Sequence, residues 1–440
     1  MLSARLLILF LCGMIMSSRA QEKFLIKNNR KSDKIKFEMV NNLMIVPVEL
    51  NGTQLSFLVD TGVKTSVLLT LNKEDTLLLK NAEKIFLKGI GGEELIEAYR
   101  SVDNKFTLGK TTHPGLSLYV IFDENINFSP RLGVPVHGII GYDLFKDFIV
   151  EINYSRNFFR LHDPDRFKKR LRGYSRLPLQ FHQEKPYVEV DVEIDGMEAR
   201  ANLLLDNGLS DALWLFPDDD KIHVPEKTYT DFLGMGLLGD VIGERGLVGS
   251  IKIGEEVLEN IPASFPDSLS VQDLKTYRAR NGSIGAETLR RFHLIFDYKN
   301  QSLYLRGNKD RQQAFSFDMS GIILEHSGFK VIESYEEVVS SILSKSENQN
   351  EIIMEPSFFK KFELKPAFKI ARLRENAPAM SAGLKVGDEV LKINRRNAWK
   401  MELDDFTKIF SSGAGETITM EVLRKGRRFN YQFRLENPFQ

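Results

Sequence analysis

Cysteine is nearly absent from this chain of 440 residues, which holds a single one, Cys12. No disulfide can therefore crosslink the chain internally, and a hydrophobic core has to supply its stability. The length is sufficient for two or three domains of ordinary size, each with a core of its own.

An excess of charge of either sign is absent too. The chain has 60 basic and 60 acidic residues, so it lacks the electrostatic footprint of a nucleic-acid-binding protein. Its 7 histidines are isolated, with no His-Glu-x-x-His pattern and no cysteine partner, which leaves a metal site without support. The sequence also has no Gly-x-Ser-x-Gly elbow and no phosphate loop. We expect no cofactor, no metal and no nucleic-acid partner.

Long hydrophobic runs are missing apart from one near the N-terminus. Arg5 precedes the apolar run Leu6–Leu11, and Ser18-Arg19-Ala20 places small residues where a signal peptidase cleaves. This run is too short to span a bilayer, and no later run is longer. We predict a signal peptide over residues 1–20, a mature chain from Gln21 and no integral membrane segment. Export without a mature cysteine favours a bacterial envelope protein, either periplasmic or extracellular.

One short sequence motif occurs twice. An apolar strand, Phe57–Val59, runs into Asp60-Thr61-Gly62, and 146 residues later Leu203–Leu205 runs into Asp206-Asn207-Gly208. The glycine after each acid lets the backbone turn tightly. Two carboxyls delivered by equivalent loops can share one water, one acting as general base while the other donates a proton.

A second match follows each acidic loop. Ile139–Phe145 aligns without gaps to Ser283–Leu289, and the register continues through Tyr154 and Tyr298 at a constant offset of 144 residues. Internal self-similarity of this length indicates one structural unit that occurs twice. Each copy also begins with a predicted hairpin before its acidic loop.

Each repeated unit resembles a retropepsin lobe, and two of them in one chain resemble a bilobal, pepsin-like aspartyl protease. The resemblance implies a mainly β fold, with lobe 1 at residues 21–165 and lobe 2 at residues 166–310. It also implies a polypeptide substrate and a catalytic pair, Asp60 and Asp206. The supporting residues of the two catalytic loops are then Thr61, Gly62, Asn207 and Gly208.

Each lobe also holds a glycine-rich segment between its acidic loop and its closing glycine. A flap over the substrate needs a small and mobile tip, so these segments are flap candidates. Two glycine-rich turns in a β-rich protein are the alternative interpretation. The candidate flap residues are Gly89, Ile90, Gly91, Gly92, Gly234 and Gly236.

The motifs depart from the family pattern in two ways. Val63 and Leu209 stand where the family has a small residue, and Asn207 replaces the threonine whose hydroxyl helps to clasp the two loops. Three interpretations remain open. The chain is an active two-lobed endopeptidase, a non-catalytic peptide-binding or assembly protein with the protease fold, or a homodimeric protease that uses only Asp60.

Sequence character changes after about residue 311. The stretch Ala377–Asn394 closely resembles the Ala-Gly-Leu and Gly-Asp-Glu-Val signature of bacterial PDZ domains attached to envelope proteases, and an amphipathic helix is expected over Leu403–Phe410. We therefore expect an α+β PDZ domain over residues 311–440, with an insertion at about 329–366. The combination of domains resembles exported proteins of the Bacteroidetes type.

A PDZ domain binds an extended C-terminal peptide by adding it as a strand, and backbone N–H groups hold its carboxylate. The candidate loop for this role is formed by Ser320, Gly321, Ile322 and Ile323. A C-terminal peptide ligand is thus a second expected partner besides the substrate.

Overall fold

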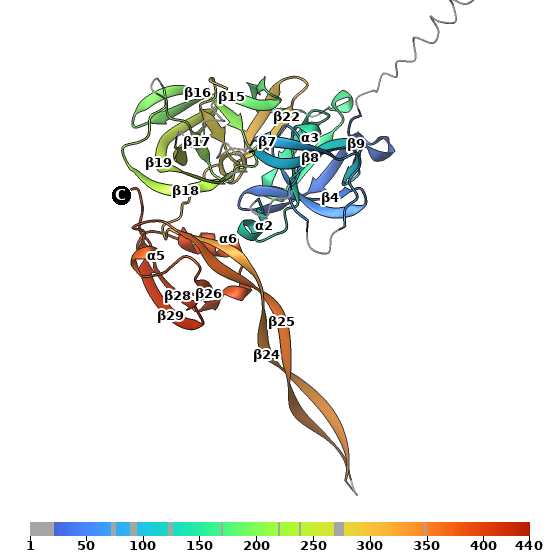
Figure 1. The fold of residues 1–440 in the computed structure, drawn as a ribbon, viewed down its shortest axis with the longest axis vertical. Helices are drawn as coiled ribbons and strands as arrows, with labels where there is room; N and C mark the ends of the chain where they lie inside the picture. Colours follow the sequence, from blue (N-terminus) through green and yellow to red (C-terminus); the bar gives the residue numbers. More distant parts are fainter. Residues whose placement is uncertain are drawn as a thin grey trace, which may run out of the picture.

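The computed structural model describes the whole chain except residues 1–21, 72–75, 89–94, 122–125, 169, 219–220, 237–238, 268–276 and 347–348. Two β-rich lobes lie side by side, a smaller C-terminal domain packs beneath them, and a long two-stranded ribbon projects away (Figure 1). The fold is mainly β, as expected from the sequence. Among the described residues, no helix is long and apolar enough to cross a membrane.

The first lobe is built on one large sheet with strand order β1-β9-β6-β10-β5-β4-β8-β7, and β3 pairs with β4 at its side. Its strands are β1 (Leu25–Ile26), β3 (Glu38–Val40), β4 (Leu43–Leu50), β5 (Thr53–Val59), β6 (Val67–Leu68), β7 (Glu83–Lys88), β8 (Leu95–Leu108), β9 (Thr111–Val120) and β10 (Gly138–Ile140), and its short helices are α2 (Ser129–Leu132) and α3 (Tyr142–Phe145).

The second lobe repeats this plan with the order β14-β15-β16-β21-β17-β20-β19-β18. Its elements are β14 (Gln180–His182), β15 (Lys185–Ile194), β16 (Met197–Leu205), β17 (Leu213–Leu215), β18 (Thr228–Gly236), β19 (Gly239–Ile253), β20 (Glu256–Pro266), β21 (Gly282–Ile284) and helix α4 (Ala286–Leu289). Asp195 and Gly196 join β15 to β16 with φ of 48° and 79°, as a tight hairpin turn requires.

The duplication seen in the sequence is a duplication of structure. The strand before each acidic loop pairs in parallel with the strand that ends in the closing motif: Phe57 with Gly138 in lobe 1, and Leu203 with Gly282 in lobe 2. Equivalent residues in the two pairs are 146 and 144 positions apart, the offsets found in the sequence. The two lobes are therefore two copies of one structural plan.

A third sheet, of order β13-β23-β22-β11-β12-β2, crosses from one lobe to the other. Its strands are β2 (Ser32–Lys36), β11 (Ile149–Asn153), β12 (Phe158–His162), β13 (Ser175–Pro178), β22 (Phe292–Asp297) and β23 (Ser302–Gly307). Strand β11 of lobe 1 pairs antiparallel with β22 of lobe 2, and one hydrophobic cluster extends from Phe24 to Leu305. The lobes thus share one sheet and one hydrophobic core.

The C-terminal domain has its own core. A sheet of order β24-β25-β26-β28-β29 packs on helix α6 (Leu403–Phe410), whose Leu403, Phe406 and Phe410 are buried. The remaining elements are β24 (Ile322–Ser346), β25 (Gln349–Leu373), α5 (Pro378–Ser381), β26 (Glu389–Ile393), β27 (Arg396–Asn397), β28 (Thr417–Arg424) and β29 (Arg427–Arg434). The helix predicted over Leu403–Phe410 has these bounds in the structure.

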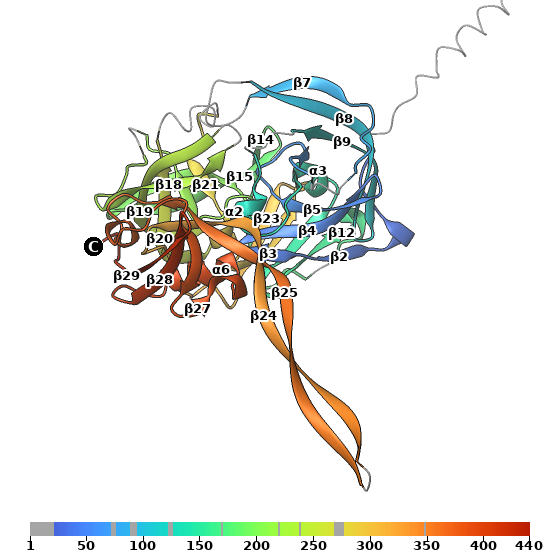
Figure 2. The same cartoon turned by 60° about the horizontal axis from the view of Figure 1, so that its bottom comes forward.

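Strands β24 and β25 continue beyond this domain as the projecting ribbon, which points away from the hairpin β7–β8 (Figure 2). Phe329 pairs with Pro366 and Ser346 with Gln349, so the stretch predicted as an insertion, about 329–366, lies within this ribbon. It lengthens two sheet strands and leaves the domain's core complete.

Candidate active site

Two equivalent strand ends deliver Asp60 and Asp206 to one place. Each acid follows the last residue of its strand, β5 or β16, and each backbone N–H donates to the closing strand of its own lobe. The distances are 2.9 Å from Asp60 N to Ile140 O and 3.0 Å from Asp206 N to Ile284 O. Since the bonds are the same in both lobes, the two side chains are presented in the same way.

The loop glycines show how close the two carboxyls are. Gly62 N donates to Asp60 Oδ1 at 2.6 Å, and Gly208 N donates to Asp206 Oδ1 at 3.1 Å. A β-carbon added to Gly62 would lie 3.1 Å from Oδ1 of both acids, and one added to Gly208 would overlap the carboxyl of Asp60. Each glycine therefore leaves room for the acid of the opposite lobe.

The closing glycines have a similar role beneath the loops. A β-carbon on Gly141 would overlap the carbonyl oxygens of Asp60 and Val63, and one on Gly285 would overlap the carbonyl oxygen of Asp211. The repeated apolar-apolar-Gly motif is thus required because a backbone segment passes directly under each acidic loop.

Only one of the two acidic loops donates a side-chain hydrogen bond to the loop of the other lobe. Thr61 donates its hydroxyl hydrogen to Leu205 O at 2.6 Å, accepts from Asn207 N at 3.1 Å and makes a longer contact of 3.5 Å to Asn207 Oδ1, all across the lobe boundary. Asn207 is buried, yet its Nδ2 has no hydrogen-bond partner. The substitution of threonine by asparagine therefore leaves the approximate symmetry broken at this position.

The two acids influence each other electrostatically. Burial, the adjacent charge of Asp206 and a hydrogen bond between the two side chains together raise the pKa of Asp60 to about 8, and burial has the largest effect. The N–H of Gly62 and the ammonium of Lys185 act in the opposite direction. At neutral pH the pair consequently holds a proton on Asp60, as is typical of two carboxyls that cannot both ionise easily.

Basic and phenolic side chains surround the pair, and the motifs did not reveal them. The charges of Asp206 and Asp60 act on Lys185, whose pKa is lowered mainly by burial. Burial, followed by the charge of Asp60, raises the pKa of Tyr298 well above its usual value. Arg280 is 8% exposed and also lies within electrostatic range of Asp206. The hairpin register of β15 and β16 was the sequence signal that could have identified Lys185.

The candidate flap residues of lobe 1 and lobe 2 differ in how far the structure describes them. Gly89, Ile90, Gly91 and Gly92 lie outside the described residues, beyond the last pair of β7 and β8, Lys88 with Leu95. In lobe 2, Gly234 and Gly236 lie near the end of β18, and Gly236 pairs with Gly239 of β19. Their role over a substrate stays a prediction.

The predicted peptide-binding loop contacts the chain's own polar groups. Asp318 accepts from Ser320 N at 3.1 Å and from Gly321 N at 2.6 Å, and Ser320 Oγ accepts from Ile322 N at 3.0 Å. Ile323 follows as the second residue of β24. The N–H groups of Ser320, Gly321 and Ile322 are thus already bonded within the chain, and the binding role of this loop stays a prediction.

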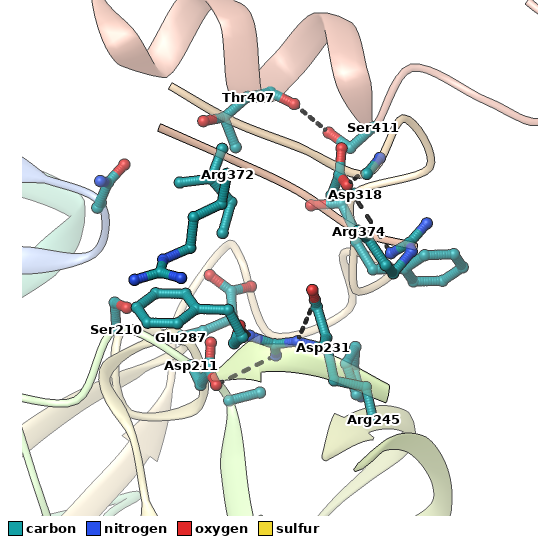
Figure 3. Close-up of a pocket in the computed structure, with 18 of the residues that line it drawn as sticks. Ser210, Asp211, Asp231, Arg245, Glu287, Asp318, Arg372, Arg374, Thr407 and Ser411 are labelled. Atoms are coloured by element: carbon teal, nitrogen blue, oxygen red, sulfur yellow. Dashed lines mark hydrogen bonds and ion pairs between the residues drawn. The ribbon is translucent and has the colours of Figure 1, made fainter. Parts of the chain in front are cut away.

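A cavity of about 860 Å³ separates this loop and α6 from lobe 2 (Figure 3). Thr407 and Ser411 line it on the helical side, and Ser210 and Asp211, which follow the second acidic loop, line it opposite. On the lobe 2 side, the guanidinium of Arg245 forms ion pairs with the carboxylates of Asp211 at 3.2 Å and Asp231 at 2.9 Å. The cavity therefore lies between the C-terminal domain and the lobe that carries Asp206.

The contact between the C-terminal domain and lobe 2 uses aromatic and basic side chains. The guanidinium of Arg372 lies 4.5 Å from the ring centre of Phe232 and pairs with Asp240. Near the end of the chain, the ring of Phe439 lies 5.3 Å from that of Tyr229. Arg372, Phe232, Tyr229 and Phe439 also line the cavity, so these contacts form part of its wall.

Comparison with known families agrees with this geometry. A family model described as aspartyl protease matches residues 46–144, which include Asp60, and a model described as PDZ domain matches residues 369–424. The chain carries an aspartyl protease domain and a PDZ domain. The PDZ match extends from the end of β25 through α6 into β28, and so covers most of the C-terminal core.

The comparison with solved structures gives a crystal structure of the aspartic proteinase from Irpex lacteus. The sequences are 12% identical, the TM-score is 0.38, and the match covers 64% of this chain and 99% of that one. No curated protein matches the sequence.

Proposed function

We propose that this protein is an aspartic endopeptidase that hydrolyses peptide bonds with the pair Asp60 and Asp206. The observation that carries the proposal is the reciprocal packing of the loops, in which the glycine of each loop leaves space for the acid of the other lobe. Two carboxyls held this close, with the proton on one of them, form the acid and base that peptide hydrolysis needs.

The proposed chemistry follows from the protonation of Asp60. Asp206 takes a proton from a water while the oxygen of that water forms a bond to the scissile carbonyl carbon. Asp60 gives its proton to the carbonyl oxygen. In the second step the proton on Asp206 passes to the amide nitrogen, the C–N bond breaks, and the hydroxyl returns its proton to Asp60. Both acids then regain their starting states.

Two features support a single chain as the catalytic unit. Asp206 fills the place beside Asp60 that a second copy of the chain would supply in a homodimeric protease, and the sheet joining β11 to β22 fixes the two lobes together. A homodimer that uses only Asp60 would need this arrangement to open, which is costly because the lobes share one core.

A second candidate function is non-catalytic peptide binding. The incomplete clasp favours it, because Asn207 leaves a buried polar atom without a partner where the first loop makes two bonds. In that case the function of the molecule is peptide binding by the PDZ domain. In the endopeptidase, we propose that the PDZ domain holds a segment of the polypeptide substrate or a C-terminal peptide, and that the protein acts after export, in the periplasm or outside the cell.

The two candidates are separated by incubating the chain from Gln21 with a denatured protein mixture between acid and neutral pH, with and without an aspartic protease inhibitor. Inhibitor-sensitive fragments that are absent with Asp60→Asn support the endopeptidase. Retention of unfolded protein on the immobilised chain, with no fragments at any pH, favours the binding protein.

A further inference from the structure

Lys185 lies across from Asp206. Strands β15 and β16 pair antiparallel, with Tyr187 opposite Leu204, and continuing this register by two residues puts Lys185 opposite Asp206. Residues directly opposite one another in such a pair point to the same face and are close neighbours. The electrostatic effect of Lys185 on Asp60, and of both acids on Lys185, agrees with this placement.

Arg280 brings a second positive charge to the same place. It is 8% exposed and is fixed by two bonds, from Nε to Gly282 O at 3.2 Å and from a terminal nitrogen to Ser283 Oγ at 2.7 Å. Its guanidinium carbon lies 5.1 Å from the ring centre of Phe216, and its charge acts on Lys185. Both bonded acceptors are neutral, so neither balances its charge.

Lobe 1 has no such charges at the equivalent positions. Continuing the pairing of Ile45 with Leu58 by two residues puts Leu43 opposite Asp60, and the offset of 144 relates Arg280 to Val136. Leu43 and Val136 are buried in one small apolar cluster. The fold therefore needs only an apolar contact here, and the two cations of lobe 2 need another explanation.

The charges around the pair do not balance. With its shared proton the pair carries one negative charge, whereas Lys185 and Arg280 carry two positive charges. The nearby phenols, Tyr187 and Tyr298, stay neutral because their pKa is raised. In the described part of the chain, neither cation forms an ion pair with a carboxylate within 4.0 Å. A partly buried cation without a counter-ion is costly, and a bound anion removes that cost.

We propose that Lys185 and Arg280 form a subsite beside the pair that binds a carboxylate side chain of the substrate. The enzyme then prefers a peptide with Glu or Asp at one position next to the scissile bond. This inference rests on the proposed endopeptidase function and adds a substrate class to it. An ammonium and a fixed guanidinium favour the carboxylate over its neutral amide analogue, since a hydrogen bond between charged groups is the stronger one.

The test uses fluorogenic peptides in pairs that differ only by Glu or Gln, with the substitution moved through each position around the scissile bond, at neutral pH and low salt. We expect kcat/KM to be about tenfold higher for Glu than for Gln at one position, the effect of one charge-assisted hydrogen bond. Raising the salt concentration should weaken this preference, because ions screen the attraction.

Three variants test whether Lys185 causes the preference for Glu over Gln. Lys185→Met should reduce the Glu preference to near unity, whereas Lys185→Arg should keep it. Lys64→Met is the matched control, since Lys64 pairs with Glu184 at 3.3 Å and should not affect the choice between Glu and Gln. Retention of the full preference in Lys185→Met would overturn the assignment.

The wild-type comparison tests the inference without any variant. Equal cleavage of Glu and Gln peptides at every position would overturn the subsite and leave the endopeptidase intact. Absence of cleavage of all peptides and of denatured protein would overturn both.

Discussion

Thr61 of the first lobe donates its hydroxyl hydrogen to Leu205 of the second, at 2.6 Å, and this bond has no counterpart from Asn207. The two acidic loops are therefore tied by one threonine in place of the two that the family pattern implies. Because Nδ2 of Asn207 is buried without a hydrogen-bond partner, the boundary between the lobes carries a cost that a hydroxyl would remove.

Asn207→Thr should stabilise the chain, and its activity should be kept or raised. A threonine hydroxyl can form the missing bond across the lobe boundary, and the substitution removes the buried Nδ2 that has no partner. Together the two changes should raise the free energy of unfolding by about 1–2 kcal/mol. Denaturant unfolding measures the stability, and turnover on one unfolded substrate measures the activity. Thr61→Asn, which removes the existing bonds, should have the opposite effect. A loss of stability in Asn207→Thr would contradict the account of the clasp.

Activity should persist to neutral pH. The pair works while Asp60 holds its proton, and burial raises the pKa of Asp60 to about 8, so activity should decline only as the pH rises through that value. The pH profile of kcat/KM on one peptide measures this decline. Activity confined to strongly acidic pH would show that Asp60 loses its proton much earlier than this environment implies.

The same proton makes stability depend on pH. The folded chain binds it more tightly than the unfolded chain, because the pKa of Asp60 rises from 3.8 to about 8. This contribution is fully present below the lower value and is lost as the pH rises through the higher one. Asp60→Asn removes the buried acid, so above pH 8 the variant should be more stable than wild type, by about 2–5 kcal/mol. Thermal unfolding of both proteins across this range is the measurement, and parallel curves would contradict it.

Residues 311–440, expressed alone, should unfold in one cooperative transition. The PDZ domain has a core separate from that of the lobes, and its helix α6 buries its apolar face within that core. Contacts such as Phe439 with Tyr229 are lost in the fragment, so we expect a lower midpoint than in the full chain. Circular dichroism during heating tests this. A fragment with no transition would show that the lobes are needed for the domain to fold.

Several parts of this structure could be predicted because they follow local rules. The two acidic loops, the closing glycines and the bounds of α6 depend on short motifs whose backbone geometry is demanding, such as the close approach at Gly141. The repeat then implied two equivalent lobes. These features need no knowledge of how distant segments pack.

Other parts depend on contacts that motifs do not encode. Lys185 lies 21 residues before Asp206, and only the register of a hairpin brings the two together. The bonds from Ser320 and Gly321 to Asp318, and the position of α6 against lobe 2, likewise arise from tertiary packing. The ribbon β24–β25 was expected only as an insertion, because its strand register could not be inferred from its residues.

Turnover by Asp206→Asn tests the central claim most directly. If Asp60 and Asp206 of one chain form the catalytic pair, then Asp206→Asn should abolish cleavage of an unfolded substrate as completely as Asp60→Asn, at wild-type levels of folded protein. Asp211→Asn, an acid of the same lobe that pairs with Arg245 at 3.2 Å, serves as the control and should retain cleavage by its folded fraction. Full activity in Asp206→Asn would contradict the two-lobe mechanism.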